Sequence, residues 1–325
     1  MNRGPDVNRP HDRVRESRHH GQPAVLLQAP DGARATVLLH GAHLSSWQPT
    51  PGDERLYLSG TSRYGPGEAV RGGVPVIFPR FALGACNAEV PRHGFVRTRA
   101  WRLVPRAPAG AASPPPGRSH APEPGCANEP GPACEPDAGA EARVVLELVD
   151  DDETRAMWPR RFALRLGVAL SGERLTLALC VHNTGDEPFD FSAALHTYFS
   201  VSDIASVRVT GLEGLAFDDK VAGRRDVERS PALRFQTETD RVYERVRETI
   251  VLHDGQRVLR IDQRGFEDAV IWNPWAERCA ALPDMPADDY RRMVCIEAAQ
   301  VMRPVTLPAG GHWEGVQTLS IPATA

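Results

Sequence analysis

The segment RFALRLGVALSGERLTLALCVHN, residues 161–183, decides the fold class. Large apolar side chains occupy alternate positions of residues 162–170 and 175–181, and Ser171 and Gly172 lie between the two runs. A period of two is typical of strands with one face in the core, and a Ser-Gly pair is typical of a turn. We therefore expect two strands of an antiparallel sheet here.

The same alternation continues on both sides of this segment. Strand-like runs bounded by Gly, Pro, Asp or Asn recur along the chain, and no long amphipathic helix pattern interrupts them. Their number and spacing favour an all-β chain folded as a large antiparallel β-sandwich. The other expected strands are residues 24–28, 33–40, 41–47, 56–59, 144–149, 189–195, 207–210, 249–253, 258–262, 269–272, 293–298 and 313–320.

Two segments lack the alternation. Residues 1–22 are rich in Arg, His, Asp and Pro, and we expect a disordered tail there. Residues from about 105 to 141 are dominated by Pro, Gly, Ala and Ser, a composition that cannot bury much apolar surface. Because strand patterns resume after this segment, we expect an insertion within a single domain of residues 23–325. Its cysteines, Cys126 and Cys134, are expected to be reduced and unpaired.

Composition limits the partners of the chain. The net charge of −4 over 325 residues gives no electrostatic basis for binding nucleic acid or an anionic membrane, and no apolar run approaches the length of a transmembrane helix. The N-terminus lacks the apolar core of a signal peptide, so we expect the chain to be in the reducing cytoplasm. We also expect a monomer. The six cysteines form no C-x-x-C pair, and their spacing predicts neither a zinc site nor a disulfide framework.

Two residues are candidates for acid–base chemistry. His196 follows the apolar run 189–195, and histidine can exchange a proton near neutral pH. Glu297 lies inside the apolar run 293–299, and a buried carboxylate is costly unless it is paired or hydrogen-bonded. The alternatives are a core histidine bonded to a backbone carbonyl and a glutamate on a solvated strand face.

Cationic residues gather in two further motifs. Arg71 precedes a pair of glycines that allow close approach of the backbone to a ligand. The segment 91–97, PRHGFVR, holds Arg92, His93 and Arg97, and the last two are four residues apart, so on an extended strand they would share a face. Such a face could bind a polyhydroxylated or anionic ligand. The alternative for Arg71 is a solvated side chain at the start of a strand.

Five motifs occur in a characteristic order: RGGVPVIFP (71–79), HGFVR (93–97), LHTYF (195–199), NPW (273–275) and the segment 284–297 that ends in CIE. In this order they resemble the aldose 1-epimerase (galactose mutarotase-like) superfamily, and within it the glucose-6-phosphate 1-epimerase, or hexose-6-phosphate mutarotase, branch. The resemblance covers roughly residues 24–322, apart from the insertion. It implies the supersandwich fold of the family, a single domain of two twisted antiparallel sheets.

The resemblance also implies roles for individual residues. Arg80 and Arg92 depart from the branch, which often has glutamine or valine at the first position and usually glutamine at the second. Arg92 could tighten phosphate binding or change which sugar fits. By the resemblance, the catalytic pair is His196 and Glu297, the sugar-phosphate contacts are Arg71, Arg97 and, in a loop, Asp240, and His93 lines the pocket.

The implied reaction interconverts the alpha and beta anomers of a hexose 6-phosphate, with glucose 6-phosphate as the expected substrate. Glu297 would act as the base and His196, protonated at the start, as the acid, while Arg71, Arg92 and Arg97 hold the phosphate. Ring opening and closure of this kind needs no metal and no redox cofactor, so we expect none. Two alternatives stay open: an epimerase of unphosphorylated aldoses and a non-catalytic carbohydrate-binding β-sandwich.

Overall fold

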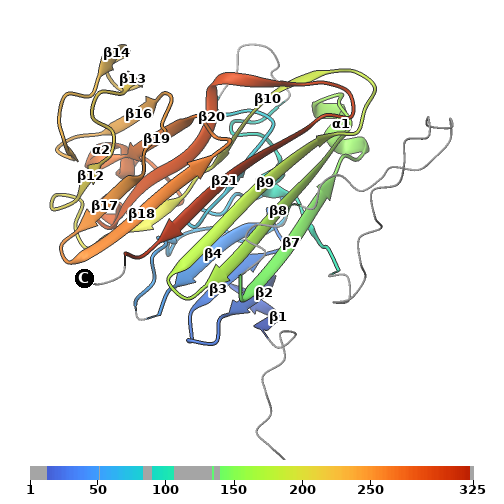
Figure 1. Ribbon diagram of the computed structural model, residues 1–325, viewed down its shortest axis with the longest axis horizontal. Coiled ribbons are helices and arrows are strands. Elements are labelled where there is room, and N and C mark those ends of the chain that lie inside the picture. Colours follow the sequence, from blue (N-terminus) through green and yellow to red (C-terminus); the bar gives the residue numbers. More distant parts are fainter. Residues whose placement is uncertain (1–12, 51, 83–89, 106–133, 135–139, 323–325) are drawn as a thin grey trace, which may run out of the picture.

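Antiparallel strand pairs dominate the computed structural model, which describes residues 13–50, 52–82, 90–105, 134 and 140–322 (Figure 1). The strands form sheets of nine, eight and four strands. The helices in the described ranges are all short, which agrees with the all-β class expected from the alternation. None of these helices is long and apolar enough to cross a membrane. They are α1 (Asp152–Met157), α2 (Trp275–Ala280) and the 3-10 helices η2 (Val96–Thr98) and η3 (Asp289–Arg292).

The nine-stranded sheet is built around the segment 161–183. Strands β8 and β9 pair in register from Phe162 opposite Asn183 to Ser171 opposite Arg174, and alternate side chains of both enter the core. In spatial order the strands are β15 (Leu233–Arg234), β12 (Arg208–Thr210), β17 (Ile250–Asp254), β18 (Arg257–Arg264), β21 (His312–Ser320), β9 (Arg174–Asn183), β8 (Phe162–Ser171), β7 (Ala142–Val149) and β6 (Arg102–Leu103).

The eight-stranded sheet is organised around its longest strand, β20, which has 15 residues. This strand pairs with β19 on one side and with β10 and β11 on the other, so it brings segments about 100 residues apart into contact. In spatial order the strands are β14 (Arg224–Val227), β13 (Ala216–Asp219), β16 (Thr239–Tyr243), β19 (Asp268–Asn273), β20 (Met293–Leu307), β10 (Phe189–Leu195) and β5 (Val76–Ile77), and β11 (Tyr198–Ser200) pairs with β20.

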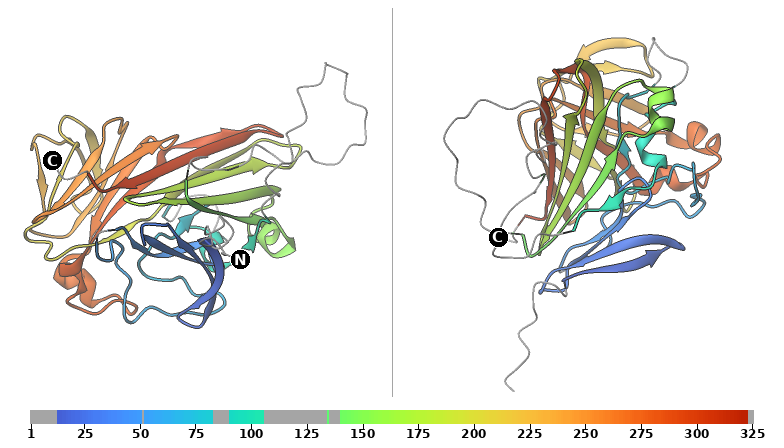
Figure 2. Two further views of the ribbon diagram at one scale, coloured as in Figure 1. Left: turned by 60° about the horizontal axis from the view of Figure 1, so that its bottom comes forward. Right: turned by 90° about the vertical axis from the view of Figure 1, so that its right-hand side faces the viewer.

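The four-stranded sheet corrects one expectation. It consists of β1 (Val14–His19), β2 (Gln22–Gln28), β3 (Arg34–Leu38) and β4 (His43–Gln48), and Figure 2 shows it in blue beside the larger sheets. A disordered tail over residues 1–22 is therefore wrong from residue 13 onward, and residues 1–12 lie outside the described part. Because β1 is an edge strand with mostly exposed side chains, it has no apolar alternation to reveal it. The feature that marks the hairpin of β1 and β2 is the turn at His20 and Gly21, where both residues have positive φ, as in the tight turns of hairpins.

The proline-rich insertion connects β6 to β7, which are neighbours in the nine-stranded sheet. Residues 106–133 and 135–139 lie outside the described part, so the structure does not test the expectation for most of the insertion. Cys134 is described, and it forms a disulfide with Cys180 on β9. The expectation of a reduced, unpaired Cys134 is thus wrong. The two cysteines are 46 residues apart, and only the fold brings them together.

Candidate active site

A cavity of about 500 Å³ lies against the eight-stranded sheet. Its base consists of same-face residues from β16, β19 and β20, because Asp240 pairs with Trp272 and Val270 pairs with Glu297 across the strands. All seven residues singled out from the sequence line this one cavity: Arg71, Arg92, His93, Arg97, His196, Asp240 and Glu297. It is also lined by Phe81, Ala82, Lys220, Val242, Val270, Trp272, Arg278, Leu282, Val301 and Met302.

His196 and Glu297 meet in the interior of this cavity. The Nδ1 atom of His196 lies 3.2 Å from Oε1 of Glu297, and the two residues are 7% and 1% exposed. The imidazole stacks on the ring of Tyr198 with 4.7 Å between centroids, and His93 approaches its edge at 5.7 Å. Neither Nδ1 of His196 nor Oε2 of Glu297 has a hydrogen-bond partner among the described residues. Both atoms are buried, and the pair is held together by the 3.2 Å contact between its two members.

Backbone and side-chain contacts hold the two residues in place. His196 follows the last residue of β10, and its backbone N–H donates to the carbonyl of Pro75 at 3.0 Å. The next residue, Thr197, donates its hydroxyl to the Gln317 side chain at 2.6 Å, and Gln317 donates to the carbonyl of Ile296 at 3.3 Å. This buried chain of bonds links the end of β10 to β20 through β21 of the other large sheet. It sets the spacing between the imidazole and the carboxyl group.

Burial also shifts the pKa values of both groups. It lowers the pKa of the His196 imidazole well below 6.5, and the positive charges near it, with Arg71 and Arg97 among them, act in the same direction. Burial raises the pKa of the Glu297 carboxyl group well above 4.5, and Asp240 adds to this. Both shifts favour a neutral imidazole beside a protonated carboxyl group. A protonated His196 before substrate binds, as expected from the sequence, is therefore not the favoured form.

Arg71 is fixed by ion pairing and is not a solvated side chain. Its Nε and Nη2 atoms each donate to the carboxylate of Asp284 at 3.1 Å, and its Nη1 donates to the hydroxyl of Tyr198 at 3.0 Å. The glycines that follow it have positive φ and allow close packing, since a Cβ at Gly72 would lie 2.3 Å from the carbonyl oxygen of Tyr57. The paired glycines thus place Arg71 at the wall of the cavity.

The segment 91–97 is a turn, which corrects the expected extended strand. His93 and Gly94 have φ of 65° and 72°, and the 3-10 helix η2 follows. His93 and Arg97 still reach the same cavity, but through the curvature of the turn. Arg97 donates from Nη2 to the carbonyl of Arg92 at 3.0 Å, while its buried Nε has no partner among the described residues. Burial and the nearby arginines lower the pKa of His93 to about 3, so its ring is neutral.

Asp240 belongs to strand β16, so the expectation that it lies in a loop is wrong. Burial raises the pKa of its carboxyl group, and the charges of Arg92, Lys220 and Arg278 oppose that shift. Lys220 and Arg278 line the cavity and had no role in the sequence argument. Lys220 could have attracted notice as the only lysine of the chain. Arg278 stands in the short helix α2 and has no sequence signal of its own.

His196 and Glu297 also lie close enough to the thiol of Cys295 for a metal ion to contact all three groups. Ligand atoms of His196, Cys295 and Glu297 lie within 4.8 Å of one another. However, Arg71 and Arg97 act on the same imidazole through their positive charges, and they would repel a cation placed there. The arrangement fits proton exchange with a polar or anionic ligand better than metal binding.

The chain is similar to known proteins along most of its length. The model of the aldose 1-epimerase family matches residues 132–320. A relative from Cenchrus ciliaris named "Putative glucose-6-phosphate 1-epimerase" is 33% identical over 306 residues, which are 92% of this chain and 85% of the relative. A relative of the same name from Escherichia coli K12 is 34% identical over 269 residues, 82% of this chain and 79% of the relative.

Solved structures agree with these sequence relatives. The crystal structure of a protein titled "a putative mutarotase" from Salmonella typhimurium superposes with a TM-score of 0.79 and 28% identity. The match covers 98% of this chain and 97% of that chain. It confirms the expected mutarotase-like supersandwich fold.

Proposed function

The chain belongs to the aldose 1-epimerase family, and on this premise we propose that it interconverts the alpha and beta anomers of a hexose 6-phosphate. The main support is the 3.2 Å contact of His196 with Glu297 in a cavity that is also lined by four arginines. Acid–base ring opening needs two proton-exchanging groups at one sugar ring, and an anionic substituent suits guanidinium groups. The names of the relatives point to glucose 6-phosphate as the substrate.

In the proposed reaction, the carboxylate of Glu297 removes the proton of the C1 hydroxyl group. The C1–O5 bond breaks as the C1 oxygen becomes a carbonyl, and protonated His196 gives its proton to O5. Rotation about the C1–C2 bond of the open aldehyde presents the other carbonyl face to O5. Ring closure then reverses both proton transfers, so the enzyme returns to its starting protonation state.

In this proposal, the phosphate group of the substrate supplies the negative charge that favours the ionised form of the pair. The neutral pair that burial favours and the ionised pair of the reaction hold the same number of protons, and 3.2 Å separates the two atoms that would exchange one. The positive charges of Arg71 and Arg97 disfavour a protonated His196. A bound phosphate dianion paired with these arginines would offset their charge and favour proton transfer from Glu297 to His196.

Polarimetry on freshly dissolved alpha-glucose 6-phosphate tests the proposal. His196→Ala and Glu297→Gln should each lower kcat by about 10²–10⁴-fold, the range for loss of a general acid or base. His253→Ala is the matched control, because His253 lies on β17 and is absent from the cavity lining. A rate near that of the unaltered protein in either cavity variant would contradict the assignment.

An epimerase of unphosphorylated aldoses is the second candidate. Its support is the ion pair of Arg71 with Asp284, because this carboxylate already neutralises one of the four guanidinium groups that line the cavity. The ratio of kcat/KM for glucose 6-phosphate and for glucose separates the two. We expect the phosphorylated sugar to be favoured, and Arg97→Gln to lower kcat/KM for it more than for glucose. Binding of sugar without any mutarotation would instead favour a non-catalytic carbohydrate-binding protein.

A further inference from the structure

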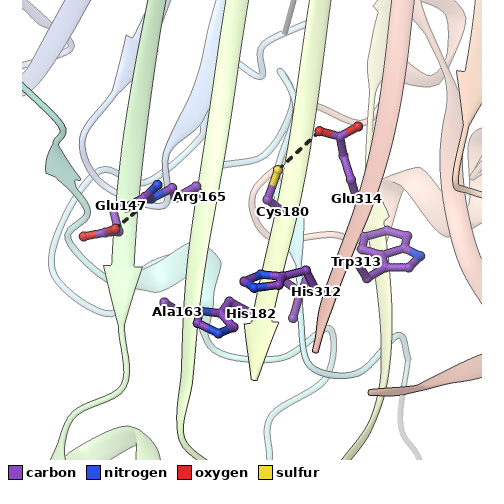
Figure 3. A pocket seen from close by; sticks show the side chains of 9 residues that line it. Glu147, Ala163, Arg165, Cys180, His182, His312, Trp313 and Glu314 are labelled. Carbon is purple, nitrogen blue, oxygen red and sulfur yellow. Dashed lines mark hydrogen bonds and ion pairs between the residues drawn. The ribbon is translucent and has the colours of Figure 1, made fainter. Parts of the chain in front are cut away.

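A second cluster of reactive side chains lies on the other large sheet. Strands β9 and β21 place Cys180 opposite Glu314 and His182 opposite His312. Because side chains two residues apart share a face of a strand, these four side chains lie together on one face of the nine-stranded sheet. They line a pocket of about 180 Å³, together with Glu147 and Arg165 among others (Figure 3).

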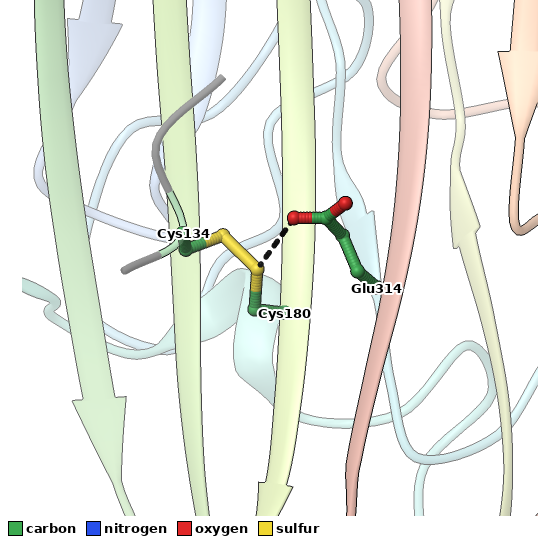
Figure 4. Close-up of side chains that lie close together, drawn as sticks. All are labelled: Cys134, Cys180 and Glu314. Carbon is green, nitrogen blue, oxygen red and sulfur yellow. Dashed lines mark hydrogen bonds between the residues drawn. A yellow bond between two sulfur atoms is a disulfide. The ribbon is translucent and has the colours of Figure 1, made fainter. Parts of the chain in front are cut away.

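Cys134 completes this cluster from the insertion. Its sulfur is bonded to that of Cys180, and the residue is 1% exposed (Figure 4). The Sγ atom of Cys180 lies 3.6 Å from Oε2 of Glu314. Ligand atoms of all three residues lie within 4.8 Å of one another. Two sulfurs and a carboxylate oxygen therefore converge on one point above the sheet.

The neighbouring imidazoles extend the donor set. The rings of His182 and His312 stack with 3.9 Å between centroids. His182 lines the pocket two residues from Cys180, and the imidazole ring offers a nitrogen that can bind a metal ion. Arg165 is itself paired with Glu147, with 2.8 Å between Nε and Oε1. Arg264 donates to Oε1 of Glu314 at 2.6 Å, which leaves Oε2 of the same carboxylate facing the sulfur of Cys180.

We propose that the reduced form of this cluster is a zinc-type metal site with Cys134, Cys180, His182 and Glu314 as ligands. Thiolate, imidazole and carboxylate are the groups that bind zinc in proteins, usually four in a tetrahedron. With zinc–sulfur bonds of about 2.3 Å, the two sulfurs would lie about 3.8 Å apart in such a site. Opening the disulfide provides this separation, whereas the bonded sulfurs cannot both act as thiolate ligands.

The two states exchange by a balanced redox step. A dithiol reductant transfers two electrons and two protons to the disulfide, which gives two thiols and leaves the reductant as its own disulfide. Binding of one divalent ion then releases the two thiol protons. In a reducing cytoplasm, where the chain is expected, the dithiol form would predominate. The disulfide would be the metal-free, oxidised state.

This site is independent of the proposed mutarotase activity. None of its four ligands lines the cavity that contains His196 and Glu297. Metal binding can therefore be measured directly, and the proposal stands or fails without reference to catalysis.

The test uses the full chain reduced with a phosphine and freed of reductant by gel filtration without oxygen. We expect one Zn²⁺ to bind per chain in a calorimetric titration, and Co²⁺ in its place to give thiolate-to-cobalt charge-transfer absorption. Cys180→Ser should remove this absorption and weaken zinc binding at least 100-fold. Cys126→Ser is the matched control, because Cys126 belongs to the same insertion, and it should bind like the unaltered chain.

Two further variants address folding and the fourth ligand. Glu314→Gln keeps both thiols and should weaken zinc binding about tenfold or more, the effect expected for groups that support a metal site. His182→Gln should weaken binding more than His312→Gln does. The proposal is overturned if the reduced chain binds no zinc, if Cys180→Ser binds as tightly as the unaltered chain, or if the oxidised chain binds equally well.

Discussion

The buried pair of His196 and Glu297 makes the stability of the protein depend on pH, and Glu297→Gln isolates the contribution of the carboxyl group. In the unfolded chain these groups titrate near 6.5 and 4.5. The raised pKa of Glu297 gives stability below pH 4.5 that is lost as pH rises. The lowered pKa of His196 gives stability above pH 6.5 that is lost as pH falls.

These two effects cancel between pH 4.5 and 6.5, where the folded pair and the unfolded pair bind the same number of protons. Above pH 6.5 the unfolded histidine has lost its proton, whereas the folded pair keeps one on Glu297. The unfolding equilibrium constant should then rise about tenfold per pH unit until Glu297 ionises. From pH 6.5 to pH 8.0 this amounts to about 2 kcal/mol of lost stability.

The glutamine of Glu297→Gln has no proton to lose, so its stability should not fall from this source. The unfolding free energy of the variant minus that of the unaltered chain should therefore increase by about 2 kcal/mol from pH 6.5 to pH 8.0. Urea unfolding followed by tryptophan fluorescence at four pH values in this interval measures the difference. Other titrating groups are common to both chains and cancel.

Two outcomes would refute this reasoning. If the difference stays constant across the interval, the folded pair holds no proton above pH 6.5, and burial does not dominate its ionisation. His196→Gln identifies the site of the proton. With the proton on the buried carboxyl group, this variant should still lose about 2 kcal/mol between pH 6.5 and pH 8.0. A loss that disappears in His196→Gln would place the proton on the imidazole.

Two further predictions concern the walls of the cavity. Gly94→Ala should lower the unfolding free energy by more than about 3 kcal/mol, since the new Cβ would lie 1.8 Å from the Phe78 carbonyl oxygen. Gly214→Ala is the control and should cost only about 1 kcal/mol, because Gly214 has a similar positive φ but open space around it. Equal urea midpoints for the two variants would contradict this. Asp284→Asn should lower the unfolding free energy by about 1–2 kcal/mol and raise KM for the sugar phosphate, because Arg71 loses its bidentate partner. An unchanged KM would show that the ion pair does not orient Arg71 for the substrate.

Local patterns were sufficient for the strands with one buried face. Alternation in residues 161–183 predicted β8 and β9, because a side chain on a strand is buried or exposed according to its own position. The same rule failed for β1, whose side chains are mostly exposed on both faces. It also failed for the segment 91–97, where a positive φ at His93 bends the backbone without any change in the apolar pattern.

By itself, the sequence determined the all-β class and the seven residues that meet in the cavity. Motif order was enough for this, because each motif is a local run of residues. Only the tertiary structure decided that Arg71 pairs with Asp284, that burial lowers the pKa of His196 and raises that of Glu297, and that Cys134 reaches Cys180. Each of these depends on strand register and burial between residues 46 or more positions apart, and no local period contains that information.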